Sequence, residues 1–234
     1  MTVFNTRARG NTRVYNPHSS HKVEVVILAK SVKHGRHCVA GKSISKKRWI
    51  RIVSNESGAE LDDSHVMITN PHGSFAVKPL QKVYVNIEKS VPLINQPENW
   101  LVDSQVKWTQ NYKIRYADLG EYLDRPQSLW GVGDKVNYSQ ILSGEFRIEQ
   151  SLYLVVVNRV RLYCREFNGK ARRRIEFDYN SQTYDLAVTD PNFDKLKVKY
   201  ETLDNVILCI SLGEPSPYDN HCYKIVATIF TEDV

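Results

Sequence analysis

Short β-branched segments separated by turn residues run along almost the whole chain, and they constrain the fold more than any other feature. Such segments lie at 22–32, 37–44, 48–54, 82–90, 151–167, 173–190, 204–212 and 222–230. Runs of this kind, bounded by Gly, Pro, Asn or Ser, are typical of β-strands. Asn180 and Ser181 occupy the turn of a predicted hairpin within 173–190. Helical patterns are confined to 116–125 and 192–202. The sequence therefore predicts an all-β chain with minor helices.

The middle of the chain interrupts this pattern and predicts a division into two halves. Between residues 92 and 144 Pro, Gly, Asn and Trp become more frequent, and no regular periodicity persists. On either side lies a β-rich block of the size of a small five-stranded barrel. We predict a flexible basic arm at 1–22, a first barrel at 23–100, an irregular and partly helical connector at 101–148, and a second barrel at 149–234. A single β-sandwich with a long inserted loop is the alternative.

The positive charge of the chain is concentrated at its N-terminal end. Residues 1–51 contain twelve Lys or Arg and one acid, Glu24, whereas the remainder has 20 bases and 25 acids. A concentrated positive field attracts polyanions and releases their counterions. Arg7, Arg9 and Arg13 belong to the arm, which has no apolar stretch typical of a signal peptide. The other bases of this region lie on or between predicted strands, so much of the charge is expected on a sheet.

Cysteine spacing and hydropathy predict the cellular compartment of the protein and whether it binds a metal. The four cysteines are widely spaced without a CxxC pair, which is typical of reduced thiols in a cytoplasmic protein. His34, His37 and Cys38 form a local cluster, but the spacing of a zinc site is missing, and we expect no metal or other cofactor. No apolar run approaches the roughly 18 residues that span a bilayer. We therefore expect a cytoplasmic protein without a membrane partner.

Several ordered motifs resemble one family. The string VVILAKSVKHGRHCVAGKSISKKRWIRIVSNESGAEL, together with QPENW, AVTDP, ISLGEP and CYKIVATIF, resembles the bacterial dual OB domain-containing proteins over most of residues 23–230. The resemblance implies two OB-like barrels and a role in nucleic-acid binding, in antiphage defence or mobile-element systems. The N-terminal arm lies outside it, so no role of the arm follows from the family.

The first candidate nucleic-acid surface follows the strands at 22–54. A turn after the first strand carries lysines and a hydroxyl that suit a phosphate, and RWIRIVS alternates Trp with Arg, which suits base stacking. An ordinary polar hairpin turn, and a core Trp49 with Arg51 reaching past it, are the competing interpretations. The predicted contacts are Lys30, Ser31, Lys33, Arg36, Lys42, Trp49 and Arg51.

A second basic segment, RVRLYCREFNGKARRR at 159–174, contains seven bases and one acid. Its bases are interleaved with Tyr163 and Phe167, and Phe177 and Tyr179 follow, as on the surfaces by which OB barrels bind single strands. A solvated hairpin edge that resists aggregation has the same composition. The predicted contacts are Arg161, Lys170, Arg172, Arg173 and Arg174.

Polar residues near the ends of the last predicted strands form a third candidate. If they converge in the second barrel, they make a pocket for a nucleotide or a modified base, with Asp190 or Glu214 as the carboxylate beside Lys224. An Asx turn before Pro191 is the competing role of Asp190. The candidate pocket residues are Asp190, Ser211, Glu214, Tyr223 and Lys224.

Three functions are compatible with these patterns. We predict foremost a nucleic-acid-binding protein, on single-stranded DNA or RNA, with no catalytic residue because no nucleophile and base are recognisably paired. A nucleotide-sensing or modified-base-sensing module, with hydrolytic activity as an option, is the first alternative. A protein-interaction subunit of a larger complex is the second, and a partner effector protein is compatible with all three.

Overall fold

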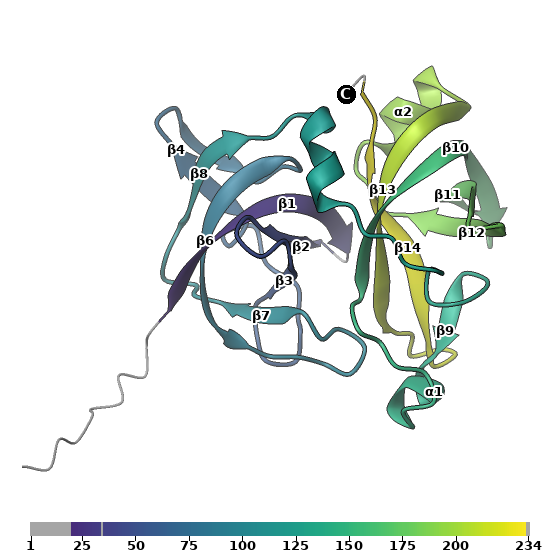
Figure 1. The fold of residues 1–234 in the computed structure, drawn as a ribbon, viewed down its shortest axis with the longest axis horizontal. Coiled ribbons are helices and arrows are strands. Elements are labelled where there is room, and N and C mark those ends of the chain that lie inside the picture. The colour runs from purple at the N-terminus through teal and green to yellow at the C-terminus, as the bar shows by residue number, and fades with distance from the viewer. Residues whose placement is uncertain (1–19, 34, 233–234) are drawn as a thin grey trace, which may run out of the picture.

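The β-branched segments of the first half close into a five-stranded barrel. The structure, a computed structural model, describes residues 20–33 and 35–232, without the side chain of Lys33 (Figure 1). The barrel strands follow one another around the wall in the order β1, β2, β3, β7, β6 and back to β1. Their bounds are β1 His21–Lys33, β2 Arg36–Ser43, β3 Trp49–Val53, β6 Gln81–Ser90 and β7 Asn99–Val102.

The second half closes in the same way. Its strands are β10 Leu152–Phe167, β11 Lys170–Tyr179, β12 Gln182–Val188, β13 Thr202–Pro215 and β14 His221–Phe230. They follow the order β10, β11, β12, β14, β13 and back to β10. In both barrels the third and fifth strands pair in parallel and the other neighbours are antiparallel. The prediction of two five-stranded OB-like barrels is confirmed, and the alternative of a single β-sandwich is wrong.

The remaining elements decorate these barrels. β8 Trp108–Lys113 pairs with β6 and continues the first sheet to β4 Met67–Asn70 and the edge strand β5 Gly73–Ala76. β9 Lys135–Asn137 pairs with β14, so parts of the predicted connector join each sheet. The helices are the 3-10 helix η1 Tyr116–Tyr122, α1 Tyr138–Leu142 and α2 Phe193–Lys199. Among the described residues no helix is both long and apolar enough to cross a membrane.

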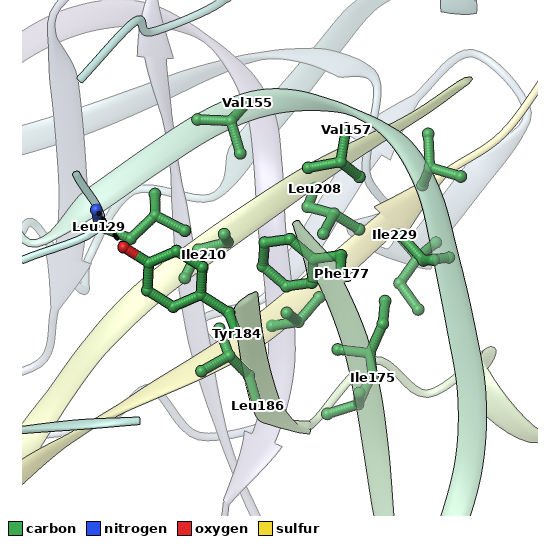
Figure 2. Packing of buried hydrophobic residues seen from close by; sticks show 14 of the residues in the cluster. Leu129, Val155, Val157, Ile175, Phe177, Tyr184, Leu186, Leu208, Ile210 and Ile229 are labelled. Carbon is green, nitrogen blue, oxygen red and sulfur yellow. Dashed lines mark hydrogen bonds between the residues drawn. The ribbon is translucent and has the colours of Figure 1, made fainter. Parts of the chain in front are cut away.

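Alternation of side chains along the strands fills the second barrel (Figure 2). Ile175 and Phe177 of β11 and Tyr184 of β12 point into it, and the rings of Phe177 and Tyr184 stack with centroids 5.7 Å apart. The Tyr184 hydroxyl is buried, so it needs hydrogen bonds. It accepts from the backbone N–H of Leu129 at 3.2 Å and donates to the carbonyl of Gly131 at 3.1 Å. Tyr184 of the second barrel thus binds the preceding connector through hydrogen bonds to Leu129 and Gly131.

A separate apolar cluster lies between the two barrels. Strands β1 to β3 meet the outer face of β10, β13 and β14 there, and η1 packs against the same cluster. In Figure 1 η1 is the teal helix between the barrels. Apolar burial at about 25 cal/mol per Å² makes such a face a stable seam instead of a hinge. The members of this seam include Val26, Leu28, Trp49, Leu119, Tyr122, Leu152, Leu154, Ile207, Cys209 and Phe230.

Candidate nucleic-acid interface

The strand that alternates Trp with Arg is buried in the seam. Arg51 is 9% exposed, and its Nη2 donates to the Oγ of Ser151 at 2.8 Å and to the Oγ of Ser211 at 3.0 Å. The Glu98 carboxylate accepts the N–H of Ser151 at 3.0 Å and its hydroxyl at 2.5 Å. Arg51 of the first barrel therefore binds the second barrel. Its expected contact with nucleic acid is replaced by this interface.

Asp124 of the connector forms a second polar junction in the seam. Its Oδ1 accepts from Lys42 Nζ at 2.6 Å, and its Oδ2 accepts from Trp49 Nε1 at 3.0 Å and from the N–H of Leu154 at 2.8 Å. Lys42 Nζ also donates to the carbonyl of Tyr122 at 2.7 Å. Because buried charges need partners, Lys42 serves this junction and is not available to a phosphate. The second barrel and the connector cover the face of β2 and β3. Lys42, Trp49 and Arg51 were predicted to contact nucleic acid, and this prediction is corrected for all three.

In the β1–β2 hairpin, beyond the seam, some residues of the first predicted surface are still accessible. Lys30 is half-buried, Ser31 is buried, and Arg36 is exposed at the start of β2. The side chain of Lys33 and the whole of His34 lie outside the described residues. His37, from the same predicted metal cluster, hydrogen-bonds through Nε2 to Asp63 Oδ1 at 2.7 Å.

Most bases of the second predicted surface are neutralised. Arg161 pairs with Glu176 at 3.1 Å, Arg174 pairs with Asp185 at 3.0 Å, and Arg173 pairs with Asp194. Lys170 and Arg172 form no ion pair with any described residue and are exposed near the tip of the β10–β11 hairpin, opposite Phe167 and Arg165 respectively. Phe167 is exposed, whereas Phe177 belongs to the core. Of the predicted contacts on this surface, only Lys170 and Arg172 at the hairpin tip therefore remain without an ion-pair partner among the described residues.

The third candidate does not form one pocket. Asp190 is buried, with Oδ1 accepting from the N–H of Asn192 and Oδ2 from the N–H of Ile229, both at 2.7 Å. Burial raises the pKa of Asp190, and the two N–H groups oppose that rise. The Asx turn considered for Asp190 is thus present, and the carboxylate ties this turn to β14. Ser211 instead faces the first barrel, where it accepts from Arg51.

Lys224 lies on the opposite side of β14 from that junction. It pairs across the sheet with Leu212, whose side chain is in the core of the second barrel. Lys224 Nζ donates to the carbonyls of Gly131, Val132 and Gly133 at 2.7, 3.1 and 2.9 Å, and burial lowers its pKa to about 8. Tyr223 is exposed and donates to Asp219 at 2.6 Å, and Glu214 is exposed. The predicted convergence of these residues is wrong, because neighbouring strand positions point to opposite faces.

The seam instead opens into a basic cleft with a cavity of about 450 Å³. The first barrel and its extensions contribute Lys30 of β1, Lys78 before β6 and Lys113 of β8. The second barrel contributes Lys195 of α2 and the C-terminal end of β14. Only Lys30 belonged to the predicted surface. Lys78, Lys113 and Lys195 lie far apart in the sequence, and Lys195 belongs to a short lysine series with Lys197 and Lys199, so no local signal unites the three in one site.

The charge of the cleft is not balanced. None of the four lysines forms an ion pair within residues 20–33 and 35–232, and Asp190, the acid in the cleft wall, already accepts two backbone hydrogen bonds. Burial and the nearby Lys78 lower the pKa of Lys30, with Asp63 acting in the opposite direction. Asp190 can offset at most one of the four positive charges, and holding the remaining like charges together is unfavourable. An anion in the cleft removes that cost.

Two threonines add unused hydrogen-bonding capacity. Thr228 of β14 and Thr231, just after it, line the cleft and are 4% and 8% exposed. Neither hydroxyl has a hydrogen-bond partner in the described part of the chain. A buried hydroxyl without a partner costs about 1–3 kcal/mol, so such groups are usually paired with a water, an ion or a ligand.

A larger cavity of about 650 Å³ lies along the seam near Ser43 and Gln150. Trp49 and Trp100 line it with Lys46 and Arg48, but Glu98, Asp124 and Glu149 line it too. Because its charges are mixed, it is a weaker site for a polyanion than the cleft of four lysines.

Comparison with known proteins agrees with this architecture. No curated protein matches the sequence. The crystal structure of the tetrameric p202 HIN2 aligns over 91% of this chain and 94% of that chain, with 7% sequence identity and a TM-score of 0.29, which is too slight a likeness to support any argument. The family model of the dual OB-containing domain matches residues 23–229, which include both barrels and the seam between them. With nearly the whole described chain matched, this protein belongs to the family of dual OB-containing domains.

Proposed function

We propose that this protein binds nucleic acid without catalysis, with the phosphate backbone in the cleft between the two barrels. The observation that carries the proposal is the convergence of Lys30, Lys78, Lys113 and Lys195 from both barrels on one cavity, where Asp190 is the acid in the lining. Nucleic acids supply that counter-charge, and their binding is driven by release of condensed counterions.

The fold explains why the ligand would bind on the seam. An OB barrel commonly binds oligonucleotides on the face of its second and third strands. In the first barrel that face carries Lys42, Trp49 and Arg51, which the connector and the second barrel cover. The lysines of the cleft come from other elements, and the cleft borders the seam at Leu80 and Phe230.

The tip of the β10–β11 hairpin supports a second contact. Arg165 and Arg172 lie opposite each other there, and Lys170 is opposite the exposed Phe167. Arginines beside an exposed aromatic ring suit a single strand, whose bases stack with about 1–3 kcal/mol each. We propose that this tip, and not the ion-paired arginines behind it, contacts the strand.

The dimensions of the cleft favour a single strand over a duplex. A cavity of about 450 Å³ admits a nucleotide but not a double helix. The family resemblance extends the proposal to a bacterial antiphage or mobile-element system, acting in the cytoplasm with a partner effector protein. DNA and RNA fit the lysines equally, because both present the same phosphates.

Fluorescence anisotropy with a single-stranded 20-mer, labelled internally, tests the proposal at several salt concentrations. We expect Lys78→Ala/Lys113→Ala to weaken binding at least tenfold. The slope of log K against log salt should fall by about 1.4, since each contact to a single strand contributes about 0.7.

The matched control is Lys89→Ala/Lys107→Ala, which removes the same charge from exposed positions outside the cleft. It should retain at least half of the parent affinity and the parent salt slope. Equal binding by both double variants would refute the cleft as the binding site.

A further inference from the structure

The cleft combines two kinds of group that a phosphate uses differently. Four ammonium groups supply charge, and the hydroxyls of Thr228 and Thr231 supply directed hydrogen bonds. Thr228 lies near the C-terminal end of β14 and Thr231 directly follows that strand, both on the wall that the second barrel contributes. Both hydroxyl oxygens are buried in the cleft wall, so rotation about χ1 is the motion that would turn each of them to a ligand.

We propose that this cleft seats a phosphate monoester, the terminal phosphate of a nucleic-acid strand. This inference rests on the proposed function and narrows it from the backbone in general to the end of a strand. The distinction is chemical: a monoester has a charge of about −1.5 to −2 and three acceptor oxygens. An internal phosphodiester has a single charge and two non-bridging oxygens.

The charge of the site favours the monoester. Lys30 already experiences the repulsion of Lys78, and the cleft adds Lys113 and Lys195. A single negative charge offsets little of this repulsion, whereas a dianion offsets about twice as much. Asp190, the acid in the cleft lining, offsets at most one of the four positive charges.

The hydrogen-bond inventory gives the same result. Three terminal oxygens can accept from both threonine hydroxyls and still contact two lysines. The buried hydroxyls of Thr228 and Thr231 thereby gain the partners that they lack within the described chain.

The seam makes the site rigid. Lys30, Lys78 and Lys113 come from one side of the seam, and Lys195, Thr228 and Thr231 from the other. The junctions at Asp124 and Arg51 hold the two barrels in a fixed relation. A site fixed in this way orders few groups on binding, which favours affinity and discrimination.

Binding of three oligonucleotides of one sequence, with a 5′-phosphate, a 3′-phosphate or hydroxyls at both ends, tests the inference. We expect the parent to bind one phosphorylated strand at least tenfold more tightly than the hydroxyl-ended strand. Thr228→Val/Thr231→Val should lose most of this preference and still bind the hydroxyl-ended strand. Thr228→Ser keeps the hydroxyl and should therefore retain the preference for the phosphorylated strand.

Thr109→Val, an isosteric change on exposed β8, is the control for the loss of a strand hydroxyl and should behave as the parent. Thermal melts check that each variant is folded. If the parent binds all three strands equally, the terminal-phosphate inference is overturned and the proposed function stands.

Binding of a nucleoside 5′-monophosphate is the remaining measurement. If it binds in a threonine-dependent way while no strand binds, the monoester seat is supported, but strand-end recognition and the proposed function are overturned. If neither the mononucleotide nor any strand binds, both proposals are overturned.

Discussion

Asp124 is the residue whose removal tests most directly how the two barrels are held together. Its carboxylate accepts from Lys42, Trp49 and Leu154 at 2.6, 3.0 and 2.8 Å. Two of these donors belong to the first barrel and one to the second. Asp124→Ala leaves Lys42, a residue that is 3% exposed, with the Tyr122 carbonyl as its one hydrogen-bond acceptor among the described residues.

The expected loss follows from these contacts. Breaking a buried ion pair from one side costs about 3–5 kcal/mol, and each further buried donor left without an acceptor costs about 1–3 kcal/mol. The Asp124 side chain is 16% exposed, so water replaces part of what is lost. We expect Asp124→Ala to lower the free energy of unfolding by about 4 kcal/mol, a large share of the 5–15 kcal/mol typical of a folded protein.

Urea unfolding followed by tryptophan fluorescence measures this loss, because Trp49 donates directly to Asp124. Glu121→Ala is the control. It removes an acid three residues away whose pair with Lys47 is exposed, and should cost less than about 1 kcal/mol. In a Lys42→Met background the cost of Asp124→Asn should fall by at least about 1 kcal/mol, since the two residues are coupled. A loss below about 1 kcal/mol for Asp124→Ala would refute the assignment of the junction.

Three further variants test individual sites of the second barrel. Burial lowers the pKa of Lys224 from 10.5 to about 8, so unfolding takes up a proton between these pH values. The stability of the parent should therefore rise relative to Lys224→Met by about 3 kcal/mol from pH 8 to pH 10.5, and parallel urea-derived profiles would contradict this. Ser181 has a φ of 63° in the β11–β12 turn, so Ser181→Gly should stabilise by about 0.5 kcal/mol in thermal unfolding. Asn180→Gly should not stabilise, because it removes side-chain bonds to the carbonyls of Pro126 and Gln127.

Local sequence patterns were sufficient for most of the barrel strands and for their division into two barrels, but not for β7, which closes the first barrel, or for β4, β5, β8 and β9. The β-branched segments all form strands, and the hairpin turn at Asn180 and Ser181 lies between β11 and β12 as predicted. The two helical patterns became η1 and α2, both shorter than expected. Alternation and β-branched runs are local patterns, which is why a single sequence reports many strands, whereas the pairing of strands depends on distant segments.

Local patterns were a poor guide to which charged residues are accessible. Arg51 and Lys42 have the same basic character as Lys30 in the sequence, yet the first two are bonded across the seam and only Lys30 lines the cleft. The arginines of 159–174 form a dense run, but acids of β11, β12, α2 and β13 neutralise several of them. Neither outcome depends on neighbours along the chain.

The sequence by itself thus determined that this chain is all-β, forms two small barrels and has an excess of positive charge. Only the tertiary structure decided where that charge remains free. Lys78, Lys113 and Lys195 come from separate elements, and they act as one site because the barrels pack across an apolar seam. The physical reason is that secondary structure depends on local side chains, whereas an electrostatic site depends on distances between segments that only packing brings together.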